Sequence, residues 1–298
     1  MKDILNIVFR LTVSCLMAAT VMGAAFIITD KAKKHNEHAR EERTMYGLLG
    51  YGERKPVPAT LALHQIYRYI ITEPGRQLIG YLVPTAQAGK AGYTLVSLDL
   101  EGKMADRKEV ALDAEQSREK EDRDKAVLAA VGPGKEIRFA DHTIVVTNDS
   151  KRVAYLLGGK FPGFKTFINV MLALDQKYAM LGVEVLEHEE DPGLGAEIEK
   201  DYFKKQFKGR SFDVLKGLQV VKEPLPEQYR QALEGHLADA DVSRIMEQFK
   251  DKNIYALTGA TISSRMLTDG VKGMAVKFAY RLDILDRVLK EQKIAVSF

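Results

Sequence analysis

Hydroxyl-bearing residues crowd into one short stretch of the sequence. Residues 257–264 read LTGATISS, in which threonines and serines flank a glycine and an alanine. From Ile262 onward the spacing of apolar residues predicts an amphipathic helix. Those residues are Met266, Leu267, Val271, Met274, Phe278, Leu282, Leu285 and Leu289. The first turn of such a helix carries unpaired N–H groups and the positive end of the helix dipole, and both favour an anion. Since these residue types are also ordinary N-cap residues, a plain helix cap is the alternative.

A second stretch, residues 182–195, reads GVEVLEHEEDPGLG and leaves a predicted strand. Pro192 fixes φ, while Gly193 and Gly195 allow a left-handed turn and a close approach to the backbone. A plain tight turn is the alternative. Residues 188–190 (HEE) are adjacent at a strand end, where successive side chains point to opposite sides. We therefore expect them to form a solvated rim rather than a metal or acid–base cluster.

Both stretches resemble motifs of one family. Residues 258–264 resemble the S/T-G-A-T-x-S/T motif of the FMN-binding domain, which occurs in the G component of the Rnf ion-translocating oxidoreductase and in the C component of the Na+-pumping NADH:quinone reductase. Residues 182–195 resemble the G-V-x-V-x-x-H-x-E-T-P-G-L-G segment of the same family. In that family the last threonine of the first motif, here Thr261, carries FMN through a phosphoester.

The resemblance implies an FMN site where the two motifs meet. The Thr261 Oγ would be the ester oxygen, and nearby hydroxyl and backbone N–H groups would receive the phosphate oxygens. Leu194 and its neighbouring glycines would lie against the flavin ring or shape its pocket. The residues expected to bind the cofactor are Thr258, Gly259, Ala260, Thr261, Ser263, Ser264, Gly193, Leu194 and Gly195. No catalytic side chain and no metal ligand is implied, because the flavin itself performs the redox chemistry.

Two positions depart from the family pattern. The family has an acidic residue three positions before the first threonine of the motif, where this sequence has Tyr255, and the nearest aspartate is Asp251. This departure bears on recognition by the flavin transferase. Asp191 stands where the family has threonine, a mild change because aspartate also initiates turns.

Composition narrows the class of protein. The chain has 298 residues and a net charge of +3, and no basic stripe is interleaved with aromatics, so we expect no nucleic-acid partner. The single cysteine, Cys15, excludes disulfides, a cysteine-ligated iron–sulfur cluster and C-x-x-C-H haem attachment within this chain. A redox cofactor must therefore be held in another way, and attachment to Thr261 fits that constraint.

The run from Leu11 to Thr29 carries no charge and is long enough to cross a hydrocarbon core of about 30 Å as a helix. A cleavable signal peptide is the alternative, since small residues lie at 18–20 and 23–25. The length of the run favours a retained anchor. Lysines and arginines are more frequent after the run than before it, which by the positive-inside rule favours a cytoplasmic domain. The resemblance instead implies a single-pass protein of the bacterial inner membrane with its domain on the periplasmic side, and we follow it.

The remaining elements follow from local patterns. We expect a charged helical stalk at 31–43, with His35 and His38 exposed, and strands at 77–83 and 93–100 separated by Pro84 and a small-residue loop. Residues 105–125 read as a solvated helix face. Residues 143–147 and 153–157 read as a hairpin, 158–163 as a break, and 167–174 and 181–186 as two strands. Helical spacing recurs at 197–207 and 239–249.

The expected fold is α+β, with a single N-terminal transmembrane helix and then an FMN-binding domain whose twisted antiparallel sheet is flanked by helices. We divide the chain into residues 1–30 (anchor), 31–158 (charged stalk and N-terminal part of the soluble domain) and 159–298 (FMN-binding core with the long C-terminal helix). A doubly wound sheet is not expected, because no G-x-G-x-x-G follows a strand.

By resemblance, we expect a membrane-anchored flavoprotein subunit of an Rnf-type electron transport complex. It would be an electron carrier within a translocase, with the other membrane subunits, a flavin transferase and the lipid bilayer as partners, and with Na+ or H+ as the transported ion. The G component of Rnf is preferred over the C component of the quinone reductase because the motif reads T-G-A-T-I. Two alternatives stay open: a stand-alone extracytoplasmic flavoprotein, and a flavin-less assembly or sensor protein of the same fold, which Tyr255 would favour.

Overall fold

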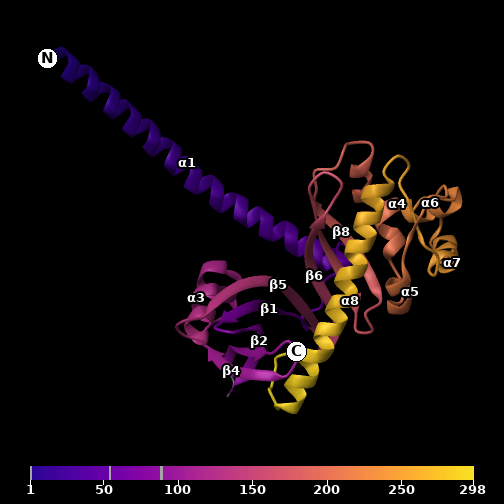
Figure 1. Cartoon of the computed structure of the whole chain (residues 1–298). Coiled ribbons are helices and arrows are strands. Elements are labelled where there is room, and N and C mark those ends of the chain that lie inside the picture. The colour runs from indigo at the N-terminus through magenta and orange to yellow at the C-terminus, as the bar shows by residue number, and fades with distance from the viewer. Residues whose placement is uncertain (1, 54, 88–89) are drawn as a thin grey trace. The chain divides into compact units, whose positions relative to one another are not determined.

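Contacts within the chain divide it into two units, Met1–Gly47 and Leu48–Phe298. The computed structural model describes residues 2–53, 55–87 and 90–298 (Figure 1).

The first unit is a segment of one long helix, α1 (Lys2–Leu48). Its stretch Asn6–Gly23 is long and apolar enough to cross a membrane. A cleaved signal sequence would meet the same criterion, so the choice of a retained anchor stays a prediction. Residues 31–43 continue the helix, as the predicted stalk requires, whereas the exposure of His35 and His38 lies outside the described side chains.

The second unit is built on one antiparallel sheet, which confirms the α+β expectation. The strand order is β4-β3-β2-β1-β5-β6-β7-β8, so two four-stranded meanders join at the β1–β5 pair. The strands are β1 (Leu61–Glu73), β2 (Arg76–Gln87), β3 (Lys90–Leu98), β4 (Met104–Val110), β5 (Glu136–Asn148), β6 (Lys151–Pro162), β7 (Phe167–Asp175) and β8 (Met180–Glu187). The predicted hairpin is confirmed between β5 and β6. Asp149 and Ser150 both have positive φ there, as a tight two-residue hairpin turn requires.

Helices and short segments flank this sheet. They are α2 (Ala114–Arg118), α3 (Lys120–Val131), the 3₁₀ turns η1 (Gly195–Glu199) and η2 (Lys205–Phe207), α4 (Asp201–Lys204), α5 (Phe212–Gly217), α6 (Glu227–Glu234), α7 (Asp239–Phe249) and α8 (Thr261–Glu291), with a two-stranded parallel pair β9 (Val220–Val221) and β10 (Ile254–Tyr255). The predicted helices at 239–249 and from 262 onward are confirmed by α7 and α8.

Helix α8 lies against β6 and β7 (Figure 1) and covers one face of the sheet. Its apolar stripe, including Leu267, Val271 and Leu282, is buried in the larger hydrophobic core. Burial of each such side chain stabilises the fold by roughly 1.5–3 kcal/mol. Helix α3 packs on the opposite face over the β1–β3 meander, where Val127 and Val131 join a second core cluster.

Polar contacts fix the far half of α8 to the sheet. Asp286 accepts two hydrogen bonds from Arg152 on β6, at 2.6 and 2.8 Å. Asp283 accepts one from the hydroxyl of Tyr178, at 2.8 Å. These contacts, with the apolar stripe, hold α8 in one register on the sheet, and this register places its first turn.

Two glycines interrupt the sequence of α8, and only one of them is needed for packing. A Cβ built on Gly270 would lie 2.6 Å from the ring of Phe161 on β6. Gly270 therefore lets α8 approach the sheet closely, whereas Gly273 has nothing within 4 Å of such a Cβ.

Two sequence predictions for the N-terminal meander are wrong. Pro84 lies within β2 and pairs with Tyr93, rather than in a loop. Its missing N–H is tolerated because β1 pairs with β2 only up to Leu82. The charged run that begins at residue 105 starts as the edge strand β4, not as a helix. Charged side chains are common on edge strands, where they discourage pairing with another chain.

Two predictions for the C-terminal half also need correction. Residues 158–162 continue β6 rather than breaking it, because Gly159 gives space to the side chain of Met274 on α8. This strand also runs across residues 158 and 159, the predicted boundary within the soluble part. The helix expected at 197–207 is broken into η1, α4 and η2, although its aromatic residues Phe203 and Phe207 are fully buried as core.

Candidate functional site

Helix α8 begins at Thr261 without a side-chain cap. The N-cap position is Ala260, and no side chain of the described residues caps the helix there. Alanine is a poor N-cap because it offers no acceptor for the first N–H groups. The first turn of a 31-residue helix therefore presents donors and the positive end of the helix dipole to whatever lies beside it.

The four hydroxyl groups of this stretch differ in their surroundings. The two serines are buried and bonded internally: Ser263 Oγ donates to Glu190 Oε2 at 2.5 Å, and Ser264 Oγ donates to the Ala260 carbonyl at 2.9 Å while accepting from the Leu257 N–H at 3.0 Å. Thr258 is exposed and Thr261 is partly exposed. Within the described part of the chain, neither threonine hydroxyl has a hydrogen-bond partner. Only the threonines are thus free to react with or bind an outside group.

These contacts bear on the predicted roles of the serines. Because Ser263 and Ser264 direct their protons inward, their hydroxyls hold the start of α8 in this arrangement instead of facing a phosphate. The backbone N–H of Ser263 is still in the first turn and stays a candidate donor. Thr258 and Gly259 are exposed, and their predicted part in binding the cofactor stays a prediction.

The turn after β8 comes to this helix start, so the two sequence stretches meet. Gly193 has φ of 74°, as predicted for a left-handed turn. Gly195 does not have a positive φ, which corrects that part of the prediction; it is needed for space, since a Cβ there would lie 2.8 Å from Ser263 Oγ. Leu194 lies over Gly259, whose built Cβ would be 2.9 Å from the leucine Cδ2.

Glu190 is buried, so the expected solvated rim is wrong at this position. Its side chain is 5% exposed, and the carboxylate accepts hydrogen bonds from Ser263 and from the N–H groups of Phe164 and Lys165. Sequence reasoning could not find this contact, because adjacent acidic residues after a strand ordinarily face water.

Asp191, the departure from the family pattern, has a partner. Its carboxylate forms an ion pair with Lys165. Hydrogen bonding to Asp191 and the charge of that carboxylate raise the pKa of Lys165. The carbonyl of Asp191 also accepts the N–H groups of Leu194 and Ala196, at 3.1 and 3.0 Å. These two turn hydrogen bonds use the backbone carbonyl, so they do not depend on the side chain at position 191.

Two buried polar residues hold the segment that leads into the site. Gln206 accepts from the Tyr255 N–H at 2.8 Å and donates to the Tyr255 carbonyl at 3.3 Å. Arg210 is fully buried and donates to the carbonyls of Gln206, Lys250 and Lys252. Burial lowers the pKa of Arg210. Tyr255, the other departure, therefore has both backbone groups fixed by Gln206.

Three large apolar side chains in the segments that meet at this junction are exposed. Ile262 is 52% exposed, Leu194 46% and Phe164 56%. Phe164 belongs to the loop that Glu190 binds, and Leu194 to the turn that covers Gly259. Exposed apolar residues next to an anion-favouring helix end suit a ligand with a flat apolar part and a phosphate.

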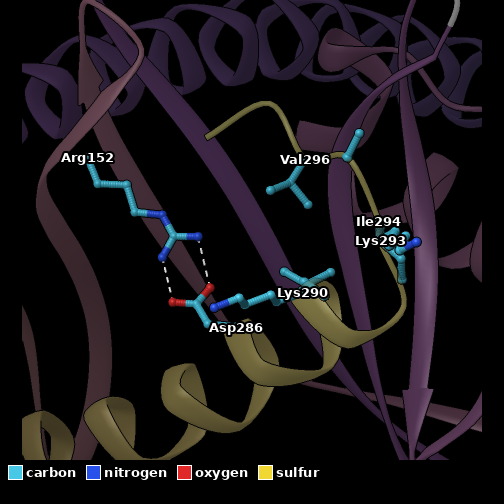
Figure 2. Close-up of a pocket in the computed structure, with 8 residues that line it drawn as sticks. Arg152, Asp286, Lys290, Lys293, Ile294 and Val296 are labelled. Carbon is cyan, nitrogen blue, oxygen red and sulfur yellow. Dashed lines mark hydrogen bonds and ion pairs between the residues drawn. The ribbon is translucent and has the colours of Figure 1, made fainter.

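A cavity of about 390 Å³ lies at the opposite end of α8 (Figure 2). Its polar groups include the Arg152–Asp286 ion pair, and Figure 2 shows these two side chains bonded to each other. Its other lining residues are Leu289, Lys290, Lys293, Ile294, Ala295 and Val296. Lys290 is roughly 40 Å along the helix axis from Thr261, so this cavity is separate from the junction of the two motifs.

No group of three or more histidine, cysteine, aspartate or glutamate side chains that could hold a metal ion is found among the described residues. Glu190, Gln206 and Arg210 are the residues that sequence reasoning missed. Each is a polar residue within a segment of ordinary composition, so only the folded structure identifies its partners.

Comparison with known proteins bears on this junction. Residues 163–275 match the FMN-binding domain. Both stretches singled out in the sequence lie within this range, so the resemblance to that domain family is confirmed.

The chain is also similar to a characterised relative. The chain is 31% identical over 123 residues to the G component of the proton-translocating ferredoxin:NAD(+) oxidoreductase complex of Clostridium ljungdahlii, a match that covers 41% of this chain and 52% of the relative. The chain thus spans about half the length of that relative.

Solved structures of similar fold include the C component of the Na(+)-translocating NADH-quinone reductase of Parabacteroides distasonis, at 20% identity and a TM-score of 0.33, covering 48% of this chain and 62% of the other. NqrC of Shewanella oneidensis matches at 18% identity and a TM-score of 0.36, covering 52% and 64%. Both TM-scores lie below 0.5, so these matches support no conclusion about the fold or the function of this chain.

The residues at the junction fit FMN. The uncapped first turn of α8 supplies N–H donors for a phosphate, the unbonded hydroxyls of Thr258 and Thr261 are accessible, and exposed apolar side chains lie beside them. Gly259 has φ of 76°, a conformation that favours glycine, so no side chain projects from this position at the junction.

Proposed function

We propose that this chain is a membrane-anchored flavoprotein subunit of an Rnf-type electron transport complex, which carries electrons through FMN bound covalently to Thr261. The observation that carries this proposal is the contrast among the four motif hydroxyls. Ser263 and Ser264 are buried and hydrogen-bonded. Thr261 is partly exposed, its hydroxyl has no hydrogen-bond partner among the residues that the structure describes, and it is the first residue of an uncapped helix.

The chain's own residues would bind and orient the cofactor. The Thr261 Oγ would form the phosphoester, and the N–H groups of Thr261, Ile262 and Ser263 would hold the phosphate oxygens. Arg265 is exposed one turn further along the same side of α8 and adds a positive charge. Leu194 and its flanking glycines would lie against the flavin ring. When bound, FMN supplies the redox chemistry, accepting and donating electrons.

Covalent attachment suits a carrier outside the cytoplasm. We place the domain on the periplasmic side of a bacterial inner membrane, where free FMN is not assured and a bound cofactor must survive many cycles. A flavin transferase would mature the protein. The other subunits of the complex would exchange electrons with it and translocate Na+ or H+. The span Asn6–Gly23 contains no acidic residue, so we assign ion passage to those subunits.

Flavin fluorescence in a denaturing gel tests attachment. The full-length protein is expressed with an active flavin transferase, beside Thr261→Ala and the control Thr258→Ala. The proposal expects fluorescent bands for wild type and Thr258→Ala and a dark band for Thr261→Ala. A dark wild-type band, with the transferase active on another substrate, would instead favour the flavin-less assembly or sensor protein, and Tyr255 would be the residue to revert to an acid.

Co-purification and labelling test the remaining parts. A native pull-down should recover further membrane subunits, and recovery of the chain alone would favour a stand-alone flavoprotein.

The side of the membrane is tested by cysteine labelling. Ser243→Cys places a thiol on the exposed side of α7, and the wild-type protein, whose single cysteine is Cys15 within the span, shows the background labelling. Labelling of intact spheroplasts by a membrane-impermeant maleimide is expected, whereas labelling only after lysis would place the domain in the cytoplasm.

A further inference from the structure

The carboxylate of Glu190 lies where three separate segments of the chain meet. It accepts from Ser263 Oγ on α8 at 2.5 Å, and from the N–H groups of Phe164 at 2.7 Å and Lys165 at 3.3 Å in the loop after β6. Glu190 itself follows β8, and its own N–H donates to His188 Nδ1 at 3.1 Å. One side chain thus joins the turn after β8, the loop after β6 and the start of α8.

The side chain of Glu190 is held by hydrogen bonds, not by an ion pair. In the described part of the chain no lysine or arginine pairs with it, and the nearby Lys165 ammonium pairs with Asp191. Three donors directed at one buried side chain hold its two oxygen atoms in a fixed position. Ala260 has no side chain that could fix the start of α8 as an N-cap. The hydrogen bond from Ser263, the third residue of α8, to Glu190 fixes it instead.

Two glycines make room for this carboxylate. A Cβ built on Gly163 would lie 2.5 Å from Glu190 Oε1, and one built on Gly195 would lie 2.6 Å from Oε2. Neither glycine has a positive φ, so both are required for space rather than for backbone conformation. The backbones of the loop and the turn close tightly around the carboxylate.

We propose that Glu190 is the positioning residue of the flavin attachment site. Its buried carboxylate fixes the first turn of α8 through Ser263 and fixes the loop at residues 164–165 against that turn. Thr261 lies two residues before Ser263, so a shift of Ser263 moves the acceptor hydroxyl directly. This inference rests on the proposed function in that Thr261 is the acceptor; Glu190 positions the site and takes no part in the transfer itself.

Hydrogen–deuterium exchange on the flavin-free protein tests the positioning. Glu190→Ala removes the acceptor for all three donors, and peptides covering 163–168 and 258–267 should then exchange roughly tenfold faster. Glu190→Gln keeps an oxygen for the two N–H groups and an amide that the Ser263 oxygen can accept, so it should restore much of the protection. Glu189→Gln, at the exposed neighbour, is the matched control and should change neither peptide. Unchanged exchange in Glu190→Ala would overturn the proposal.

Flavin transfer gives the second measurement. The initial rate of covalent flavin incorporation into Glu190→Ala should fall roughly 10- to 100-fold, because a displaced acceptor loses its orientation. Ser263→Ala should lower the rate as well, and the double variant should be no slower than Glu190→Ala, since both changes break one link. Additive effects, or wild-type rates in Glu190→Ala, would contradict the coupling.

The two measurements also separate this inference from the proposed function. A wild-type protein that an active transferase leaves unmodified would refute attachment at Thr261, whereas the exchange experiment would still decide whether Glu190 fixes both segments. If Glu190→Ala does not fold, Ser263→Ala carries the test: faster exchange in the peptide 258–267 supports the link between Glu190 and α8, and unchanged exchange there refutes it.

Discussion

Leu194 lies directly over Gly259, and a Cβ on that glycine would come within 2.9 Å of the leucine Cδ2. This contact joins the turn after β8 to Gly259, two positions before the first residue of α8, although the two residues are 65 positions apart in sequence. The backbone at Gly259 is in the left-handed region, with φ of 76°. The junction of the two motifs thus depends on a position where only glycine fits.

Gly259→Ala should therefore destabilise the protein. A left-handed φ disfavours alanine by about 1–2 kcal/mol, and the added Cβ also displaces Leu194. The free energy of unfolding in urea measures this loss. Gly273→Ala, within α8 and with nothing near its Cβ, is the control and should stabilise by about 0.5–1 kcal/mol. A stability gain at both positions would show that Gly259 is not constrained as described.

Elements with strong local patterns could be predicted from the sequence. The apolar period of α8 and the turn between β5 and β6 are properties of short windows, and both were predicted correctly. Strand β4 was not, because its charged run becomes an edge strand only through pairing with β3, which a local window does not show. Likewise Gly159 suggests a break until Met274 of α8 is known to fill its space.

Arg210→Leu should cost about 3 kcal/mol in the free energy of unfolding. The substitution removes the donors of three carbonyls, those of Gln206, Lys250 and Lys252, in a fully buried place. Urea denaturation measures the effect. Arg244→Leu, whose side chain is 69% exposed and paired only within its helix, should change stability by less than about 0.5 kcal/mol. Equal effects at the two arginines would contradict the role given to Arg210.

Stability should fall as the pH drops below about 6.5, the ordinary pKa of histidine, partly through His64. Burial lowers the pKa of His64, so the folded protein binds fewer protons than the unfolded chain in this range. The stabilisation is present above the unfolded pKa and is lost as pH falls through it toward the folded value. His64→Gln should have a smaller stability difference between pH 7.5 and pH 5.5. An unchanged difference in His64→Gln would contradict a contribution from His64.

Arg265→Gln should weaken FMN binding more than riboflavin binding. The side chain lies one turn beyond Thr261 and has no ion-pair partner among the described residues, since Asp269 one turn further pairs with Lys272 at 3.1 Å. Fluorescence titration of the flavin-free protein should show FMN affinity reduced roughly five- to tenfold and riboflavin affinity unchanged. Lys277→Gln, exposed further along α8, should alter neither. An equal loss for both ligands would show that Arg265 does not act on the phosphate.

Only part of the candidate site could be predicted from the sequence. The two motifs indicated which segments meet, because a glycine-rich turn and a hydroxyl-rich helix start are local patterns. The hydrogen bonds that separate Ser263 and Ser264 from Thr261 depend on Glu190 and on the first turn of α8 in its folded place. Burial of Glu190 requires donors from residues 164 and 165 and from Ser263, and no window of sequence contains them all.

The most direct measurement of the central claim is the mass of the tryptic peptide Asn253–Arg265 from protein expressed with an active flavin transferase. The account predicts that this peptide gains the mass of FMN less one water and that fragmentation assigns the addition to Thr261. An unmodified peptide, or an addition on Thr258 in place of Thr261, would contradict it.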